Sequence, residues 1–432
     1  MAGEARLGEV AEIIMGQSPP GETYNESGDG LPFFQGVADF NYRHPAPRVF
    51  CSAPSRIAVP GDILLSVRAP IGRVNVADRK CAIGRGLSII RPRTPEDGRY
   101  LEFALRMEEP NWDAIEGSGS VFGNATRRDL EALCLPWPEG ANDRRAIAHI
   151  LGTLDDKIEL NRRMSETLEA MARALFKAWF VDFEPVRAKC RGDPGGRPCW
   201  RRRLPGKGGF HTRPYDDLFP DRLVDSELGQ IPEGWRVGRL GDVAENLRRG
   251  VQPDCIAPNT PYIALEHMPR RSIALFDWGT AEGIESNKFE FKKGEILFGK
   301  LCPYFHKVGV APVDGVCSTD IVVIVPRQHV WTAFVLGHVS SLEFVDYTNA
   351  GSSGTKMPRT SWADMARYEI VLPPESVAET FNTLVQPLIE QIISGIHESR
   401  TLAALRDALL PKLIRGEIRV RDAERFLKER GL

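Results

Sequence analysis

An internal repeat constrains the fold of this chain more than any other feature. Leu7–Glu12 reads LGEVAE, and Leu240–Glu245 reads LGDVAE at an offset of 233 residues. Pro60–Leu65 (PGDILL) recurs as Lys293–Phe298 (KGEILF) at the same offset. Further matches follow at offsets of 234 and 235: Gly117-Ser118-Gly119 with Gly351-Ser352-Ser353, Asp129-Leu130 with Asp364-Met365, and Pro138 with Pro373. So constant an offset predicts a tandem duplication of one large unit and not a solenoid of short repeats.

Each copy opens with about 135 residues in which short β-like runs alternate with turns rich in Gly and Pro. The runs Ile63–Val67 and Leu87–Ile90 of the first copy have counterparts in Glu295–Phe298 and Ile321–Val325 of the second. At roughly 100–200 residues per domain, a chain of 432 residues is expected to form two to four domains. Each copy is therefore predicted to begin with a compact α+β domain.

A long helical pattern follows this domain in each copy. In the first copy the seam residues recur at steps of four and three, as in a coiled coil: Ile147, Leu151, Leu154, Ile158, Asn161, Ser165, Leu168, Ala172, Leu175 and Trp179. The second copy gives Leu384, Leu388, Ile392, Leu402, Leu405, Leu409 and Leu413. Pro387 and Pro411 lie inside the second pattern and are expected to kink or end it locally.

A helix of about 40 residues makes a rod of roughly 60 Å, and one apolar seam of that length is not stable alone in water. The two helices are therefore expected to pack against each other. The predicted fold is α+β, with two pseudo-symmetric globular domains joined by two long helices in an antiparallel coiled coil. The expected boundaries are residues 1–141 for the first domain, 142–184 for the central helix, 185–226 for a basic Gly/Pro-rich linker, 227–375 for the second domain and 376–432 for the distal helix.

The sequence contains no recognisable catalytic or metal-binding motif. A phosphate-binding G-x-x-x-x-G-K-[ST] loop, an H-E-x-x-H pair and an amino-methyltransferase box are all absent. The eight cysteines are scattered without a C-x-x-C pair, so reduced thiols are expected and neither a zinc site nor a disulfide framework is indicated. No apolar stretch reaches the roughly 18 residues of a membrane helix, and the N-terminus lacks the apolar core of a signal peptide. We therefore expect a cytoplasmic protein.

Several motifs resemble the specificity subunit of type I restriction-modification systems, and they occur in the order expected for that family. These are LGEVAEIIMGQSP from Leu7, PGDILLSVRAPIG from Pro60, KAWFVDFEPV from Lys177, SELGQIPEGW from Ser226, GKLCPYFHKVGVAP from Gly299 and LLPKLIRGEI from Leu409. One departure is Cys302, because the family often has a basic residue there, whereas the first copy has Val67-Arg68 in the equivalent stretch.

The resemblance implies a non-catalytic subunit that reads DNA. Each globular domain would be a target-recognition domain for one half of a bipartite double-stranded sequence, and the helices would act as spacer and as docking site for two methyltransferase subunits. Endonuclease and translocase subunits complete such complexes. The chain itself would hold no cofactor, since S-adenosylmethionine, ATP and magnesium are expected on the partner subunits. The predicted subunit-interface residues are Ile147, Leu151, Leu154, Ile158, Leu168, Leu175, Leu384, Leu388, Leu402 and Leu409.

Bidentate base contacts require Arg, Lys, Asn or Gln on loops that face a DNA groove. The candidates are Gln17, Arg68, Arg73 and Asn124 in the first domain, and Lys300, His306, Lys356 and Arg359 in the second. The net charge is only −2, so the basic character must be local.

Two other classes of protein remain open from the sequence. One is the recognition portion of a self-sufficient methyltransferase-nuclease, and the missing cofactor and carboxylate motifs argue against it. The other is a coiled-coil scaffold that binds only protein, against which the duplicated globular domains argue.

Overall fold

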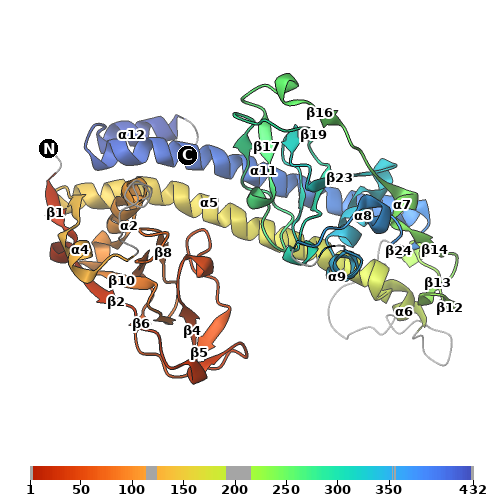
Figure 1. Cartoon of the computed structure of the whole chain (residues 1–432), viewed down its shortest axis with the longest axis horizontal. Helices are drawn as coiled ribbons and strands as arrows, with labels where there is room; N and C mark the ends of the chain where they lie inside the picture. Colours follow the sequence, from red (N-terminus) through yellow and green to blue (C-terminus); the bar gives the residue numbers. More distant parts are fainter. Residues whose placement is uncertain (1–2, 113–123, 191–215, 353, 355–356, 430–432) are drawn as a thin grey trace, which may run out of the picture. The chain divides into compact units, whose positions relative to one another are not determined.

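The computed structural model describes residues 3–112, 124–190, 216–352, 354 and 357–429. It divides into two compact units, Met1–Leu160 with Thr401–Leu432, and Asn161–Arg400. The two longest helices are α5 (Ala141–Phe176) and α11 (Glu375–Ile414), and each has one part in the first unit and the other part in the second (Figure 1). Among the described helices, none combines the length and the apolar character needed to cross a membrane.

Within the residues that the structure describes, the globular part of the first unit contains three sheets (Figure 1). The two-stranded sheet pairs β1 (Glu4–Arg6) with β11 (Cys134–Pro136). The four-stranded antiparallel sheet has the order β2 (Ala11–Met15), β10 (Leu87–Pro92), β7 (Ile63–Ser66) and β8 (Val74–Val76). The five-stranded sheet has the order β3 (Tyr24–Asn25), β5 (Val49–Cys51), β4 (Leu31–Phe34), β9 (Cys81–Ile83) and β6 (Ile57–Ala58). The helical elements of the first unit include α1 (Leu7–Val10), η2 (Val37–Asp39), α2 (Gly98–Met107), α4 (Arg127–Ala132) and α12 (Val420–Lys428).

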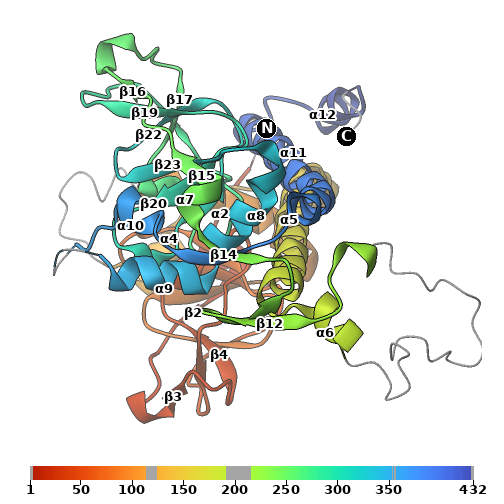
Figure 2. The same ribbon diagram turned by 90° about the vertical axis from the view of Figure 1, so that its right-hand side faces the viewer.

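The second unit repeats this set of sheets. Its two-stranded sheet pairs β14 (Arg236–Arg239) with β24 (Glu369–Leu372). The four-stranded sheet has the order β15 (Ala244–Asn246), β23 (Ile321–Pro326), β20 (Ile296–Gly299) and β21 (Val308–Val310). The five-stranded sheet has the order β16 (Gly250–Val251), β19 (Lys288–Phe291), β22 (Gly315–Cys317), β17 (Pro261–Ile263) and β18 (Gly279–Thr280). Figure 2 shows β16, β17, β19 and β22 grouped apart from β15, β20 and β23. Other elements of the second unit include α6 (Glu184–Cys190), β12 (Leu223–Ser226) paired with β13 (Gly229–Pro232), α7 (Leu240–Val243), η9 (Pro303–Phe305), α8 (Thr332–Val339), α9 (Leu342–Ala350) and α10 (Trp362–Met365).

The matching strand orders confirm the duplication that the sequence predicts. The predicted runs at Ile63, Leu87, Glu295 and Ile321 are strands β7, β10, β20 and β23. Short helices before the last strand of each domain also correspond, because Thr126 caps α4 and Ser361 caps α10 through the backbone N–H groups of Asp129 and Asp364. The five-stranded sheets share four strands in the same order, β6-β9-β4-β5 in the first unit and β19-β22-β17-β18 in the second. They differ in the fifth strand: β3 pairs with β5 at one end of this order, whereas β16 pairs with β19 at the other end.

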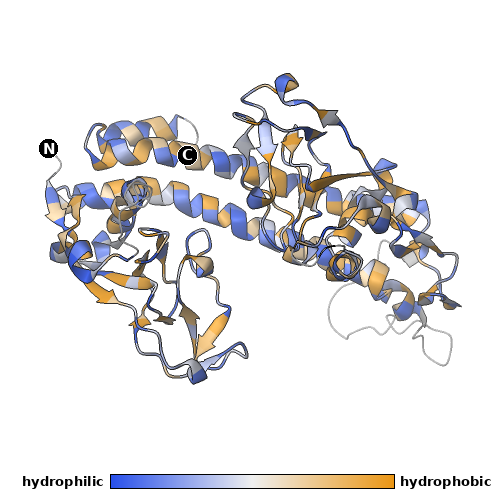
Figure 3. Cartoon of the chain, viewed as in Figure 1, coloured by the Kyte–Doolittle hydropathy of each residue, from blue (hydrophilic) through white to orange (hydrophobic). Residues whose placement is uncertain are grey.

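Parts of α5 and α11 lie side by side in an antiparallel arrangement within each unit. In the first unit, four α5 residues share a core with Leu402, Leu409, Leu413 and Ile414 of α11: Ile147, Leu151, Leu154 and Ile158. In the second unit, Leu168 and Leu175 pack with Phe381, Val385 and Ile389. Figure 3 shows hydrophobic and hydrophilic residues alternating along both helices, as expected for a buried seam.

The structure differs from the helix prediction in two details. Helix α11 does not end at Pro387 or Pro411, because its buried face holds it together against the local loss that proline causes, about 3 kcal/mol. The buried face also includes Phe381, Val385 and Ile389, whereas Leu384 and Leu388 are only half-buried. The seam read from the sequence was therefore displaced by one residue in this stretch.

The expected linker, residues 185–226, is ordered at both ends. Helix α6 begins at Glu184, and strand β12 ends at Ser226. The basic centre of the linker and the Gly117–Gly119 turn lie outside the described residues.

Candidate nucleic-acid interface

The first-domain candidates Arg68 and Asn124 meet at the loop that joins β7 to β8. Their backbones form an antiparallel bridge, and the adjacent Ala125 N–H donates to the Val67 carbonyl at 2.9 Å. Both side chains are exposed. The sequence separates these residues by more than fifty positions, so only the fold reveals that they are neighbours.

The second domain builds the equivalent junction from equivalent positions. Leu301 forms an antiparallel bridge with Arg359, and the Thr360 N–H donates to the Lys300 carbonyl at 3.1 Å. Lys300 thus occupies the position of Val67, and Leu301 that of Arg68. The candidates Lys300 and Arg359 therefore lie together at the loop between β20 and β21.

A cavity of about 730 Å³ adjoins Arg68 in the first domain. It is lined by two further arginines, Arg48 and Arg85, and by Gln35 and Asp39. Arg48 donates to Asp39 Oδ1 at 2.5 Å and to the Ala38 carbonyl at 3.0 Å. Arg85 donates to Ser18 Oγ at 3.1 Å. Sequence inspection missed Arg48, Arg85 and Gln35, because none belongs to a motif and they come from two loops, β4–β5 and β9–β10, that are far apart in the sequence.

Gln17 and Arg73 are placed differently around this region. Gln17 is exposed and precedes Ser18 of the cavity lining, and its backbone N–H donates to the Ile83 carbonyl at 3.0 Å. Arg73 is half-buried, ion-pairs with Glu109 at 3.2 Å, and lines a separate cavity of about 430 Å³. Arg73 is therefore engaged in a contact that stabilises the domain.

The second-domain candidates His306 and Lys356 do not join Lys300 at the surface. His306 is buried, its Nε2 lies 2.9 Å from the Ser340 carbonyl oxygen, and burial lowers its pKa. This environment favours packing over contact with a base. Lys356 lies outside the described residues.

Basic and aromatic side chains near His306 were missed by the sequence analysis. The Arg270 guanidinium lies 4.3 Å from the centroid of the Phe305 ring, a cation–π contact. Lys307 Nζ donates to the Leu265 carbonyl at 2.5 Å, and burial with the nearby Arg270 lowers the pKa of Lys307. Tyr304 is 52% exposed beside them. Cations interleaved with exposed aromatic rings suit a nucleic-acid surface.

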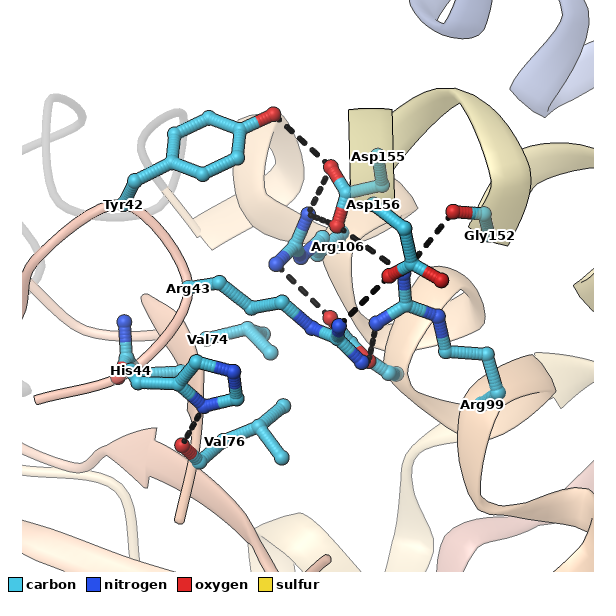
Figure 4. A network of polar contacts seen from close by, with 12 residues as sticks. Tyr42, Arg43, His44, Val74, Val76, Arg99, Arg106, Gly152, Asp155 and Asp156 are labelled. Carbon is cyan, nitrogen blue, oxygen red and sulfur yellow. Dashed lines mark hydrogen bonds and ion pairs between the residues drawn. The ribbon is translucent and has the colours of Figure 1, made fainter. Parts of the chain in front are cut away.

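A buried charge network anchors the first domain to the long helices of its unit (Figure 4). Asp155 of α5 is fully buried and accepts from Tyr42 Oη at 2.9 Å and from Arg406 of α11 at 2.6 Å. Arg106 of α2 lies 3.3 Å from the same carboxylate and 2.8 Å from Glu102. Burial raises the pKa of Glu102, while Arg106 and Arg406 outweigh the effect of burial on Asp155 and lower its pKa.

Most of the predicted subunit-interface residues are in the core of the chain itself. Ile147, Leu151, Leu154 and Ile158 are at most 4% exposed, Leu402 and Leu409 are buried with them, and Leu168, Leu175 and Leu384 pack partly buried against the second core. Only Leu388 lies outside these clusters. Side chains buried in this way do not reach another protein, so any docking surface must use the outward faces of the helices.

Comparison with known proteins shows what kind of chain carries this arrangement. Residues 3–170 match the family model for the type I restriction modification DNA specificity domain. The type I restriction enzyme MjaIX specificity subunit of Methanocaldococcus jannaschii is 27% identical over 441 residues, which cover 96% of this chain and 93% of the relative. Over almost its whole length the chain is therefore similar to type I restriction-modification specificity subunits.

Two further family members resemble the chain over different lengths. The putative MjaX specificity subunit of the same organism is 40% identical over 159 residues, 37% of either chain. The crystal structure of the type I restriction-modification system S subunit from M. genitalium matches with a TM-score of 0.53 at 14% identity over 96% of both chains. This structural match shows that the α+β fold with two domains and long helices is shared, and the family resemblance read from the motifs is confirmed.

Proposed function

We propose that the chain is the non-catalytic DNA-reading subunit of a type I restriction-modification complex, in which each globular domain reads one half of a bipartite target. The observation that carries the proposal is the repeated junction of the two domains. The β7–β8 loop of the first domain and the β20–β21 loop of the second are each bridged to the segment that precedes a short helix. Basic side chains gather at both of these junctions. Arg68, Asn124 and Gln17 are the proposed base contacts of the first domain, and Lys300 and Arg359 those of the second, with Lys356 still a prediction.

The local chemistry supports DNA as the ligand despite the net charge of −2. Lysine and arginine side chains neutralise backbone phosphates and release counterions, and only arginine, lysine and amide side chains also match base edges. Phosphate contacts set position, while base contacts set sequence. Two separate clusters of such residues on two similar domains suit a target in two parts.

We further propose that the long helices act as a spacer and dock two methyltransferase subunits, with endonuclease and translocase subunits completing the complex. Helix α5 has 36 residues, which corresponds to about 54 Å. One turn of B-DNA is about 34 Å, so a helix of this length is sufficient to separate two half-sites. S-adenosylmethionine, ATP and magnesium would bind to the partner subunits, and methyl transfer would occur there.

Exchange of one domain tests this function. Residues 3–133 are replaced by the matching domain of a relative with another target, and the hybrid is expressed with its methyltransferase subunits. Single-molecule sequencing of methylated DNA should show one altered half of the target and one unchanged half. Changes in both halves would contradict separate readers, and methyl transfer by the purified chain alone would contradict a non-catalytic subunit.

A further inference from the structure

The cavity of the first domain contains one arginine, Arg68, whose donors have no partner among the residues that the structure describes. Arg48 is held by Asp39 and Arg85 by Ser18. Among the described residues, the Arg68 guanidinium has neither a hydrogen bond nor an ion pair, although its side chain is exposed on the cavity lining. The cavity therefore combines two fixed cations with a third that is available to a ligand.

The backbone around Arg68 is fixed from both sides. The Val67 N–H donates to the Gly86 carbonyl and the Ala125 N–H to the Val67 carbonyl, each at 2.9 Å. The backbones of Gly86 and Gln35, which also line the cavity, are in close contact, since a Cβ added to Gly86 would lie 2.1 Å from the Gln35 carbonyl oxygen. Arg68 thus extends from a rigid frame, so less conformational entropy is lost when it binds.

We propose that Arg68 is the specificity-determining residue of the first domain and that it selects guanine through O6 and N7; this inference rests on the proposed DNA-reading function. The guanidinium fork matches these two acceptors with two parallel hydrogen bonds. Arg48 neutralises the Asp39 carboxylate, so Arg68 and Arg85 leave the cavity lining positively charged. This charge also attracts a phosphate, and the salt dependence of binding separates a phosphate contact from the proposed contact with a base edge.

The second domain must select its half-site by other chemistry. Leu301 takes the position of Arg68 and has no donor to offer. The cations at that junction are Lys300, one position before Leu301, and the bridged partner Arg359, whose guanidinium lies 3.6 Å from Asp320. The guanine preference is consequently assigned to the first half-site alone.

The experiment uses the full chain in complex with its methyltransferase subunits, as wild type and as Arg68→Ala, Arg68→Lys and Arg79→Ala. Arg79 is the matched control, because it is an exposed arginine of the same domain that pairs with Asp78 outside the cavity. Methylated sites are mapped by single-molecule sequencing, and binding is measured over a range of salt concentrations. Thermal melting verifies that each variant is folded.

We expect Arg68→Ala to reduce discrimination at one G·C pair of the first half-site about 10- to 100-fold and to leave the second half-site unchanged. Arg68→Lys, which keeps the charge and loses the fork, should reduce it less, and Arg79→Ala should match wild type. An unchanged target would overturn the inference. So would uniform weakening at all sequences with a salt slope reduced by about one, which marks a phosphate contact, or a first half-site without a G·C pair. If the wild-type complex methylates no defined sequence, the proposed function itself fails, which is a different result from any of these.

Discussion

At the scale of single residues, Asp155 and Asp156 show how burial decides the weight of a charge. Both are acidic residues of α5 that contact arginines of the first domain. Asp155 is fully buried among Arg99, Arg106 and Arg406, whereas the side chain of Asp156 is 61% exposed. Removing a buried charge leaves its partners buried without compensation, while an exposed pair is screened by water.

We therefore predict effects of different size for two neighbouring substitutions. Asp155→Ala should lower the free energy of unfolding by about 3–5 kcal/mol, because Arg106 and Arg406 lose their shared carboxylate. Asp156→Ala should lower it by less than about 1 kcal/mol. Urea denaturation followed by circular dichroism measures both. Equal effects of the two substitutions would show that the network does not anchor the domain.

At the scale of elements, two helical glycines distinguish a close contact from an ordinary one. A Cβ added to Gly337 of α8 would lie 2.1 Å from the Phe176 ring, where α8 packs against α5. A Cβ added to Gly395 of α11 would meet only Asn161 Cβ at 3.8 Å and Ser165 Oγ at 3.9 Å. Because glycine is less favourable than alanine inside a helix by up to about 1 kcal/mol, the two sites should respond in opposite directions.

Gly395→Ala should raise the melting temperature, and Gly337→Ala should lower it by a few degrees or more because the aromatic cluster around Phe176 must shift. Differential scanning calorimetry of the two variants beside wild type provides the measurement. A stabilising Gly337→Ala would mean that α8 does not approach α5 as closely as the structure indicates.

The long helices also show how far a sequence pattern reaches at this scale. The seam of the first helix from Ile147 to Ile158 is correct, because the four residues at heptad spacing are all buried in the first core. The predicted seam of the second helix is displaced only at Leu384 and Leu388, where Phe381 and Val385 pack against the second domain as well as against α5. A helix with two packing partners has a broader buried face than one periodicity describes.

At the scale of the whole molecule, the duplication makes a half-length chain informative. Residues 1–186 retain the first domain and α5 but lose Leu402, Leu409 and Leu413, which cover Ile147, Leu151 and Leu154 in the first core. The exposed seam should seek a second copy of itself, since an antiparallel pair of identical helices closes as a two-fold dimer. We predict that this fragment forms a homodimer, recruits methyltransferase subunits and directs methylation of a palindrome with a central spacer.

The charge network gives this prediction a sharper form. The offset of 235 residues places Met171 in register with Arg406, so the dimer would lack the cation nearest to Asp155. Met171→Arg in the fragment should tighten the dimer, as measured by analytical ultracentrifugation. Methylation of the original asymmetric target, or of a half-site without its inverted partner, would show that the two copies are not interchangeable.

The sequence by itself determined the duplication, the positions of the main strands, the heptad seam of the first helix and the resemblance to type I specificity subunits. These features are local or periodic, so they are visible in the order of residues. Only the tertiary structure decided that Arg68 meets Asn124, that Arg48, Arg85 and Asp39 share a cavity, and that Arg73 and His306 are held by other parts of the protein. The physical reason is that loops far apart in the chain converge through sheet pairing, and a side chain is available to a ligand only when its neighbours in space leave its donors unused.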